Sequence, residues 1–189
     1  MMLFQIVQAI GCSVYFVFFL LFLCASRVPR TNPGAGWWAL AMAAACLSRL
    51  ALWIFTAQDV AEHAMTVYAF FLVLEKLGLM LGAASFFGSR LAPCWIWALA
   101  GLAQGWVLFR FLAEPAYWLF FSGLSLFNML ALLFVIITIW QSQLIVPTSI
   151  RLICISGCAL LALHWSLFVP IAVLVYPAWQ DHAMVLGTV

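Results

Sequence analysis

The sequence predicts an all-α fold, a polytopic membrane protein in which six transmembrane helices pack as an antiparallel bundle. Of the 189 residues, 69% are hydrophobic and only 6% are charged, a composition that soluble domains of this size do not have. The apolar residues fall into six stretches of about 20 residues or more, the length that a helix needs to cross a bilayer. The 10 Trp and 17 Phe fit the aromatic belts of membrane proteins.

Prolines mark the connections between these stretches, because a proline can start a helix or end a turn. They are Pro29 and Pro33 after the first stretch, then Pro93, Pro115 and Pro147 before the last three. Pro170 lies inside the sixth stretch and predicts a kink. Short connections favour antiparallel neighbours. We therefore expect one domain, residues 1–189, with helices at Leu3–Ser26, Gly36–Thr56, Val60–Gly88, Ala92–Leu112, Ala116–Gln141 and Ile150–Val175.

The charged residues between the helices predict the topology, because cytoplasmic loops carry an excess of Lys and Arg. Positive charges occur in alternate connections, at Arg27, Arg30, Arg90 and Arg151. The opposite connections hold acidic and histidine residues, with Arg110 as the one exception: Asp59, Glu62, His63, Glu114, Asp181 and His182. The N-terminus is therefore expected outside, and the loops after helices one, three and five in the cytoplasm.

The end of the sequence predicts the start of a seventh helix. After a polar loop at 176–182, seven apolar residues follow at 183–189, and another span would return the chain to the cytoplasm. A short tail at the membrane interface is the alternative. We favour the interpretation that the sequence belongs to a longer chain.

Each of the last five stretches carries a polar residue about twelve or thirteen residues from its cytoplasmic end, roughly 20 Å into the membrane. These residues are Arg49, Glu75, Gln104, Asn128 and His164. A polar group in hydrocarbon is costly unless it faces the protein interior. Small residues lie on the same helix faces, such as Gly78 and Gly82 beside Glu75 and Gly157 one heptad from His164, and small residues mark helix contacts. We therefore expect a polar layer inside the bundle.

The strongest predicted pair in this layer is Arg49 with Glu75, on consecutive helices. Lys76 follows Glu75 and is expected to share its carboxylate or to approach Asn128. One interpretation is a structural ion pair that fixes helix register. The other is a binding site for a small polar or anionic ligand, or a proton-linked switch. For His164, the alternatives are a packing residue and a ligand.

The remaining chemistry is sparse. No nucleophile–base arrangement occurs, so we predict no catalytic residue, and a net charge of +2 without a basic patch argues against nucleic acid. The cysteines lie mostly in apolar stretches, where they usually behave as small apolar residues: Cys12, Cys24, Cys46, Cys94, Cys154 and Cys158. Cys154 and Cys158 share a helix face, but two thiols are fewer ligands than a metal site needs, and we predict no metal or cofactor.

The segment NPGAGWWAL at residues 32–40 resembles the start of the second helix in the multi-pass input domains of bacterial diguanylate cyclases and related signalling proteins. Further points of similarity are the glycines at the end of the third helix, Leu163-His164-Trp165 in the sixth, and a Pro/Trp loop at 176–179. The resemblance implies a sensor domain of the bacterial inner membrane, followed by a cytoplasmic output domain through which it dimerises. No GG(D/E)EF segment occurs in the 189 residues, so no catalytic role carries over.

Three functions are compatible with these patterns. The first is a sensor or input domain that binds a small ligand, or senses the membrane, and moves a helix in response. The second is a small transporter or channel with a polar path through the membrane. The third is an integral-membrane enzyme or complex subunit, with Glu75 and His164 as acid–base candidates.

The predicted topology can be tested by cysteine labelling. Single cysteines at Arg27 and Asp59, in a background without native cysteines, are expected to react with an impermeant maleimide from opposite sides of the membrane. Intact and inverted vesicles provide the two sides. Reaction of both positions from the same side would overturn the topology.

Overall fold

A computed structural model describes residues 2–28, 33–57, 61–88, 93–113, 117–142, 144 and 146–170 of the chain. Within these ranges it contains six α-helices and no strand. They are α1 (Met2–Arg27), α2 (Ala35–Ala57), α3 (Ala61–Phe87), α4 (Pro93–Ala113), α5 (Tyr117–Gln141) and α6 (Thr148–Pro170). The all-α prediction and the number of helices up to Pro170 are confirmed, and the described helix ends differ from the expected ones by at most two residues, except at the end of α6.

Five of the six helices, α1, α2, α3, α5 and α6, are long and apolar enough to cross a membrane. Large apolar side chains also cover the outside of the bundle. Leu112 is 82% exposed, Leu102 75% and Ile153 71%, and apolar exposure on this scale suits contact with lipid. The helices are therefore those of a membrane protein. Continuation of α6 past Pro170 and the expected seventh helix at 183–189 lie outside the described residues.

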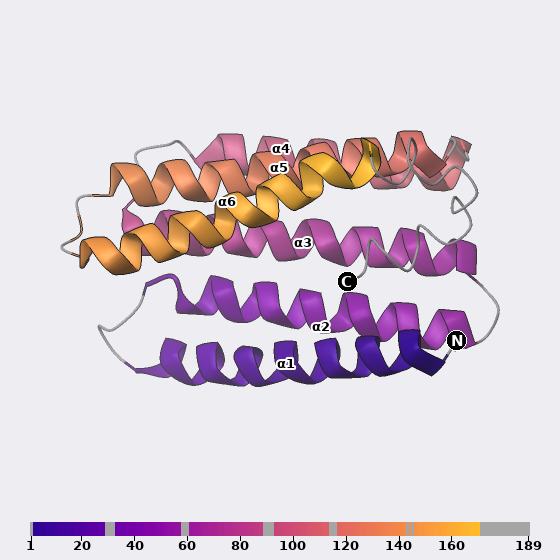
Figure 1. Ribbon diagram of the computed structural model, residues 1–189, viewed down its shortest axis with the longest axis horizontal. Helices are drawn as coiled ribbons and strands as arrows, with labels where there is room; N and C mark the ends of the chain where they lie inside the picture. Colours follow the sequence, from indigo (N-terminus) through magenta and orange to yellow (C-terminus); the bar gives the residue numbers. More distant parts are fainter. Residues whose placement is uncertain are drawn as a thin grey trace.

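Helices that follow one another in the chain run antiparallel, and α3 lies at the centre (Figure 1). It packs against α2 on one side and against α4 and α5 on the other. The two remaining helices are peripheral, since α1 packs mainly on α2 and α6 mainly on α5. Accordingly, more than half of the side chains along the span of α3 are buried, whereas few are buried along α1 or α6.

Close packing between α2 and α3 depends on the glycines of α3. A Cβ atom at Gly78 would lie 2.9 Å from Ala41 Cβ and from the Trp37 carbonyl oxygen. One turn further on, the Trp38 ring fills the space beside Gly82. The prediction that Gly78 and Gly82 mark a helix contact is confirmed, and the contact brings the two backbones together.

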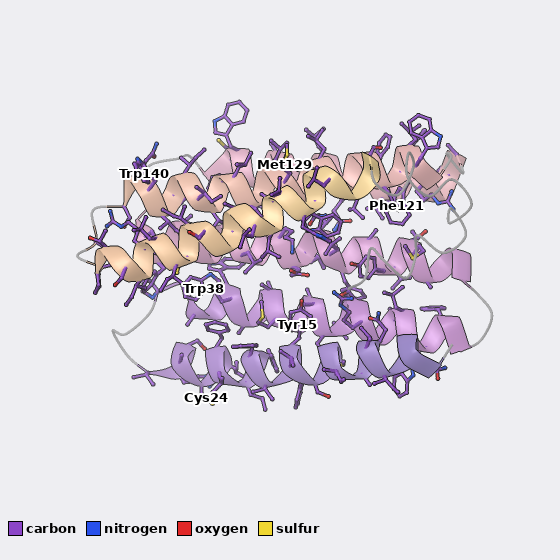
Figure 2. The ribbon with its side chains drawn as sticks, viewed as in Figure 1. Tyr15, Cys24, Trp38, Phe121, Met129 and Trp140 are labelled. Atoms are coloured by element: carbon purple, nitrogen blue, oxygen red, sulfur yellow. The ribbon has the colours of Figure 1, made fainter. Side chains whose placement is uncertain are left out.

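The Trp38 ring joins three helices at the end of the bundle that carries Arg27. Its centroid lies 5.5 Å from that of Phe22 on α1 and 5.3 Å from that of Phe86 on α3, and Figure 2 shows Trp38 projecting between the helices. Tilted aromatic pairs at these separations add to the stabilisation from burial alone. This cluster and Gly78 together hold α1, α2 and α3 in fixed register.

Replacing Gly78 with alanine should destabilise the bundle, because the new methyl group meets backbone atoms of α2 that cannot move away. We expect a loss of about 1–3 kcal/mol of unfolding free energy, as for other overpacked sites. Denaturation in mixed detergent micelles, followed by circular dichroism, measures it.

The matched control is Gly101→Ala, because no atom lies within 4 Å of the Cβ position at Gly101. This substitution should be neutral or stabilising by up to about 1 kcal/mol, since alanine favours the helix. Equal effects at the two glycines would contradict the assigned α2–α3 contact.

Candidate functional site

Arg49 of α2 is held between α1 and α3. Its Nη1 atom donates a hydrogen bond to Gln8 Oε1 on α1, at 3.4 Å. Its guanidinium carbon lies 6.0 Å from the ring centroids of both Tyr15 on α1 and Tyr68 on α3, within reach of a cation–π interaction. Figure 2 shows Tyr15 between α1 and α2. We call Gln8, Tyr15, Arg49 and Tyr68 the Arg49 cluster.

Glu75 and Lys76 form an ion pair on the central helix. Both residues are buried, at 7% and 8% exposure. Consecutive residues on a helix normally do not face each other, so the long Lys76 stem must bend back to reach the carboxylate. A buried charge is costly without a partner, and the nearest partner for each of these two groups lies on its own helix. We call them the Glu75–Lys76 pair.

The direct pair between Arg49 and Glu75 stays a prediction, because the carboxylate contact described for Glu75 is the one with Lys76. Because Gly78 lies against Ala41, the antiparallel register places Glu75 opposite Ala44, five residues before Arg49. Five residues correspond to about 7.5 Å along the helix. The two residues are therefore offset along the helix axes, and counting from the helix ends does not capture this offset. Tyr68 is near enough to interact electrostatically with both groups.

Gln104 reaches α3 from the other side. Its Nε2 atom donates to the Phe70 carbonyl oxygen at 3.1 Å, and the α2–α3 register places Phe70 opposite Arg49. Gln104 is thus at the depth of the Arg49 cluster rather than that of the Glu75–Lys76 pair. Its own Oε1 atom is buried without a hydrogen-bond partner among the described residues.

Asn128 of α5 is fully buried. Its Nδ2 atom donates to the Leu124 carbonyl oxygen of the same helix at 2.8 Å, while its Oδ1 atom has no hydrogen-bond partner in the described part of the chain. A buried carbonyl left in this state costs about 1–3 kcal/mol. Asn128 is therefore a buried acceptor that is available to a donor.

The expectation that His164 faces the interior is wrong. α6 turns Ala162 and Trp165 inward, while His164 is exposed on the opposite face, with its ring centroid 5.9 Å from that of Trp165. The prediction relied on Gly157 as a marker of helix contact. No atom lies within 4 Å of the Cβ position at Gly157, so that glycine marks the outer face.

The structure thus keeps Glu75, Lys76 and Asn128 in the interior, places Arg49 and Gln104 at helix contacts, and removes His164 from the group. That these residues bind a ligand stays a prediction. Gln8, only 1% exposed, was missed by the sequence reasoning, although an amide inside the first apolar stretch is itself a signal. Tyr15 and Tyr68 carried no such signal, because aromatic residues are common throughout the chain.

Among the described residues, no group of three or more His, Cys, Asp or Glu side chains could hold a metal ion. No protein-family model, curated protein or solved structure matches the chain. The chemistry of the interior polar side chains is therefore the basis for a proposed function.

Glu75→Gln and Lys76→Met are each expected to lower the unfolding free energy by about 3–5 kcal/mol, because each leaves a buried charge without its partner. The double variant should lose less unfolding free energy than the sum of the two single losses, since it removes both charges. A double-mutant cycle measured by denaturation in mixed micelles gives the coupling.

The control cycle combines Glu75→Gln with Arg49→Gln. Since the described ion pair of Glu75 is with Lys76, the coupling of Glu75 with Arg49 should be clearly smaller than that with Lys76. A larger coupling between Arg49 and Glu75 would contradict the described geometry.

Proposed function

We propose that this chain is an input domain of the bacterial inner membrane, with the N-terminus outside and six spans. It binds a small polar or anionic molecule in the bundle and passes a helix displacement to a cytoplasmic output domain, which also brings two copies together. The observation that carries the proposal is the unfilled acceptor on Asn128, buried among helices that also hold charged groups.

The unfilled acceptors define the ligand. Asn128 Oδ1 and Gln104 Oε1 need N–H or O–H donors, and they belong to two helices that both pack on α3. A molecule that supplies such donors removes the cost of two unsatisfied carbonyls. An ordered water would do the same, but without changing the state of the protein in response to a signal.

The charges on α2 and α3 favour an anionic group on the same ligand. Arg49 and Lys76 are cationic and Glu75 is the carboxylate paired with Lys76, so the Arg49 cluster and the Glu75–Lys76 pair together carry one positive charge in excess. Two cations with one carboxylate can accept an additional negative charge. The proposed ligand is therefore a small carboxylic acid that also carries a hydroxyl or amino group.

The central position of α3 supports the signalling role. This helix carries Tyr68, Glu75 and Lys76, and it packs against α2, α4 and α5. A ligand bound along it can change three helix contacts at once. For a response, the ligand must bind one arrangement more tightly than the other. The resemblance of residues 32–40 to input domains of diguanylate cyclase-type proteins agrees with this role.

The other two functions have less support. Transporter sites commonly use interrupted helices, whereas α2, α3 and α5 are continuous where they carry the polar residues. A shared acid–base role for Glu75 and His164 is not supported, because Glu75 is buried and His164 is exposed.

A thermal-shift titration tests ligand binding. Glycine, serine and lactate are added to the purified protein in detergent, and unfolding is followed by tryptophan fluorescence. At 100 times Kd, a ligand stabilises the folded state by about 2.7 kcal/mol. At least one compound should raise Tm, and Asn128→Leu should abolish this rise.

Ser122→Ala is the matched control, because Ser122 Oγ donates to the Trp118 carbonyl oxygen of its own helix; this variant should retain the shift. A second measurement tests the helix displacement. Spin labels are attached to single cysteines at Ser85 of α3 and Ile153 of α6, in a background without native cysteines, and the distance between the labels is measured with and without ligand. Absence of any thermal shift, or an unchanged label distance with ligand bound, would count against the proposal.

A further inference from the structure

Two cysteine thiols meet between α1 and α2. The Sγ atoms of Cys12 and Cys46 lie 3.2 Å apart. Each thiol also approaches the main chain of the other residue, with Cys12 Sγ 3.8 Å from Cys46 O and Cys46 Sγ 3.7 Å from Cys12 O. Both residues are partly buried and reduced. This reciprocal arrangement places the two sulfur atoms face to face.

The thiols lie deep within their helices. Both α1 and α2 are long and apolar enough to cross a membrane, and Cys46 lies eleven residues after Ala35, roughly 17 Å along α2. Charged, water-soluble disulfides such as oxidised glutathione do not enter hydrocarbon at this depth. An oxidant for these thiols must therefore dissolve in lipid. Few side chains of α1 are buried in the bundle, so lipid reaches this helix.

We infer that Cys12 and Cys46 are a dithiol–disulfide couple that links α1 to α2, and that a lipid-soluble quinone is its oxidant. In this reaction both S–H bonds break and one Sγ–Sγ bond forms. The quinone receives the two electrons and the two protons and becomes the hydroquinone. No other reactant is needed.

The cross-link forms beside the Arg49 cluster. Cys46 lies three residues before Arg49 on α2, and Cys12 lies four residues after Gln8 on α1, so each is about one turn from the Arg49–Gln8 hydrogen bond. A Cβ atom at the neighbouring Gly11 would lie 3.9 Å from Arg49 Cγ. Formation of the Cys12–Cys46 disulfide draws α1 and α2 together at this level. The groups that surround Arg49 are displaced as a result.

Cys154 and Cys158 provide an internal comparison. They are four residues apart on α6. Their Cβ atoms are separated by the helical spacing of about 5–6 Å, whereas a disulfide needs Cβ atoms about 3.5–4.5 Å apart. This pair therefore cannot close without distorting the helix.

The experiment uses the purified, reduced protein in liposomes without oxygen, with decylubiquinone as the probe. The free thiols, counted with maleimide after unfolding, should fall from six to four per chain. One hydroquinone should form per chain, and peptide mapping should find Cys12 joined to Cys46. Cys12→Ser and Cys46→Ala should each abolish the cross-link and the hydroquinone. The matched control, Cys154→Ser, should retain both.

Circular dichroism and size exclusion check that each variant folds, and the wild-type peptide map gives a result independent of every variant. Six remaining thiols after quinone treatment would overturn the inference. So would cross-linking between two chains, or a disulfide at Cys154 and Cys158. A cross-link that forms with dioxygen but not with the quinone would overturn the assignment of the oxidant.

Discussion

The contact of Gly78 with Ala41 sets the positions of the polar groups of α2 relative to those of α3. It brings the backbones of α2 and α3 together, so that any side chain beyond hydrogen at residue 78 would meet backbone atoms of the partner helix. The resulting register places Glu75 opposite Ala44 and Arg49 opposite Phe70. Arg49 is therefore directed to Gln8 and two tyrosine rings, while Glu75 is left with Lys76.

In an apolar interior, each charged side chain interacts with the nearest charged, polar or aromatic group that it can reach. Lys76 finds a carboxylate on its own helix, whereas Arg49 finds an amide oxygen and aromatic faces on two other helices. Both solutions avoid an isolated charge in the membrane, which costs at least about 2.5–3.5 kcal/mol. Their consequences differ. The Glu75–Lys76 pair stiffens only α3, while the Arg49 cluster joins α1, α2 and α3.

Helix positions could be predicted from the sequence because hydropathy reports contact with lipid, which every span shares. The face that each helix turns toward the interior was harder to predict, since a helix that is apolar all round has no marked inner side. Gly78 and Gly157 are alike in sequence, yet only Gly78 contacts another helix. His164 was misplaced for this reason. The meeting of Cys12 with Cys46 depends on α1–α2 register, which no local pattern in either helix reveals.

The unfilled acceptors distinguish the two interpretations of the interior polar residues. If these residues only fixed helix register, full pairing would serve best, because a partly satisfied buried network is less stable than an apolar one. The Glu75–Lys76 pair meets that requirement. Asn128 and Gln104 do not, since each keeps a buried carbonyl oxygen that has no donor among the described residues. Leucine at either position would remove this cost. The unfilled acceptors support the proposal of a ligand that completes the hydrogen bonds of these amides. In that proposal, the binding energy gained at the acceptors is available to shift the helices.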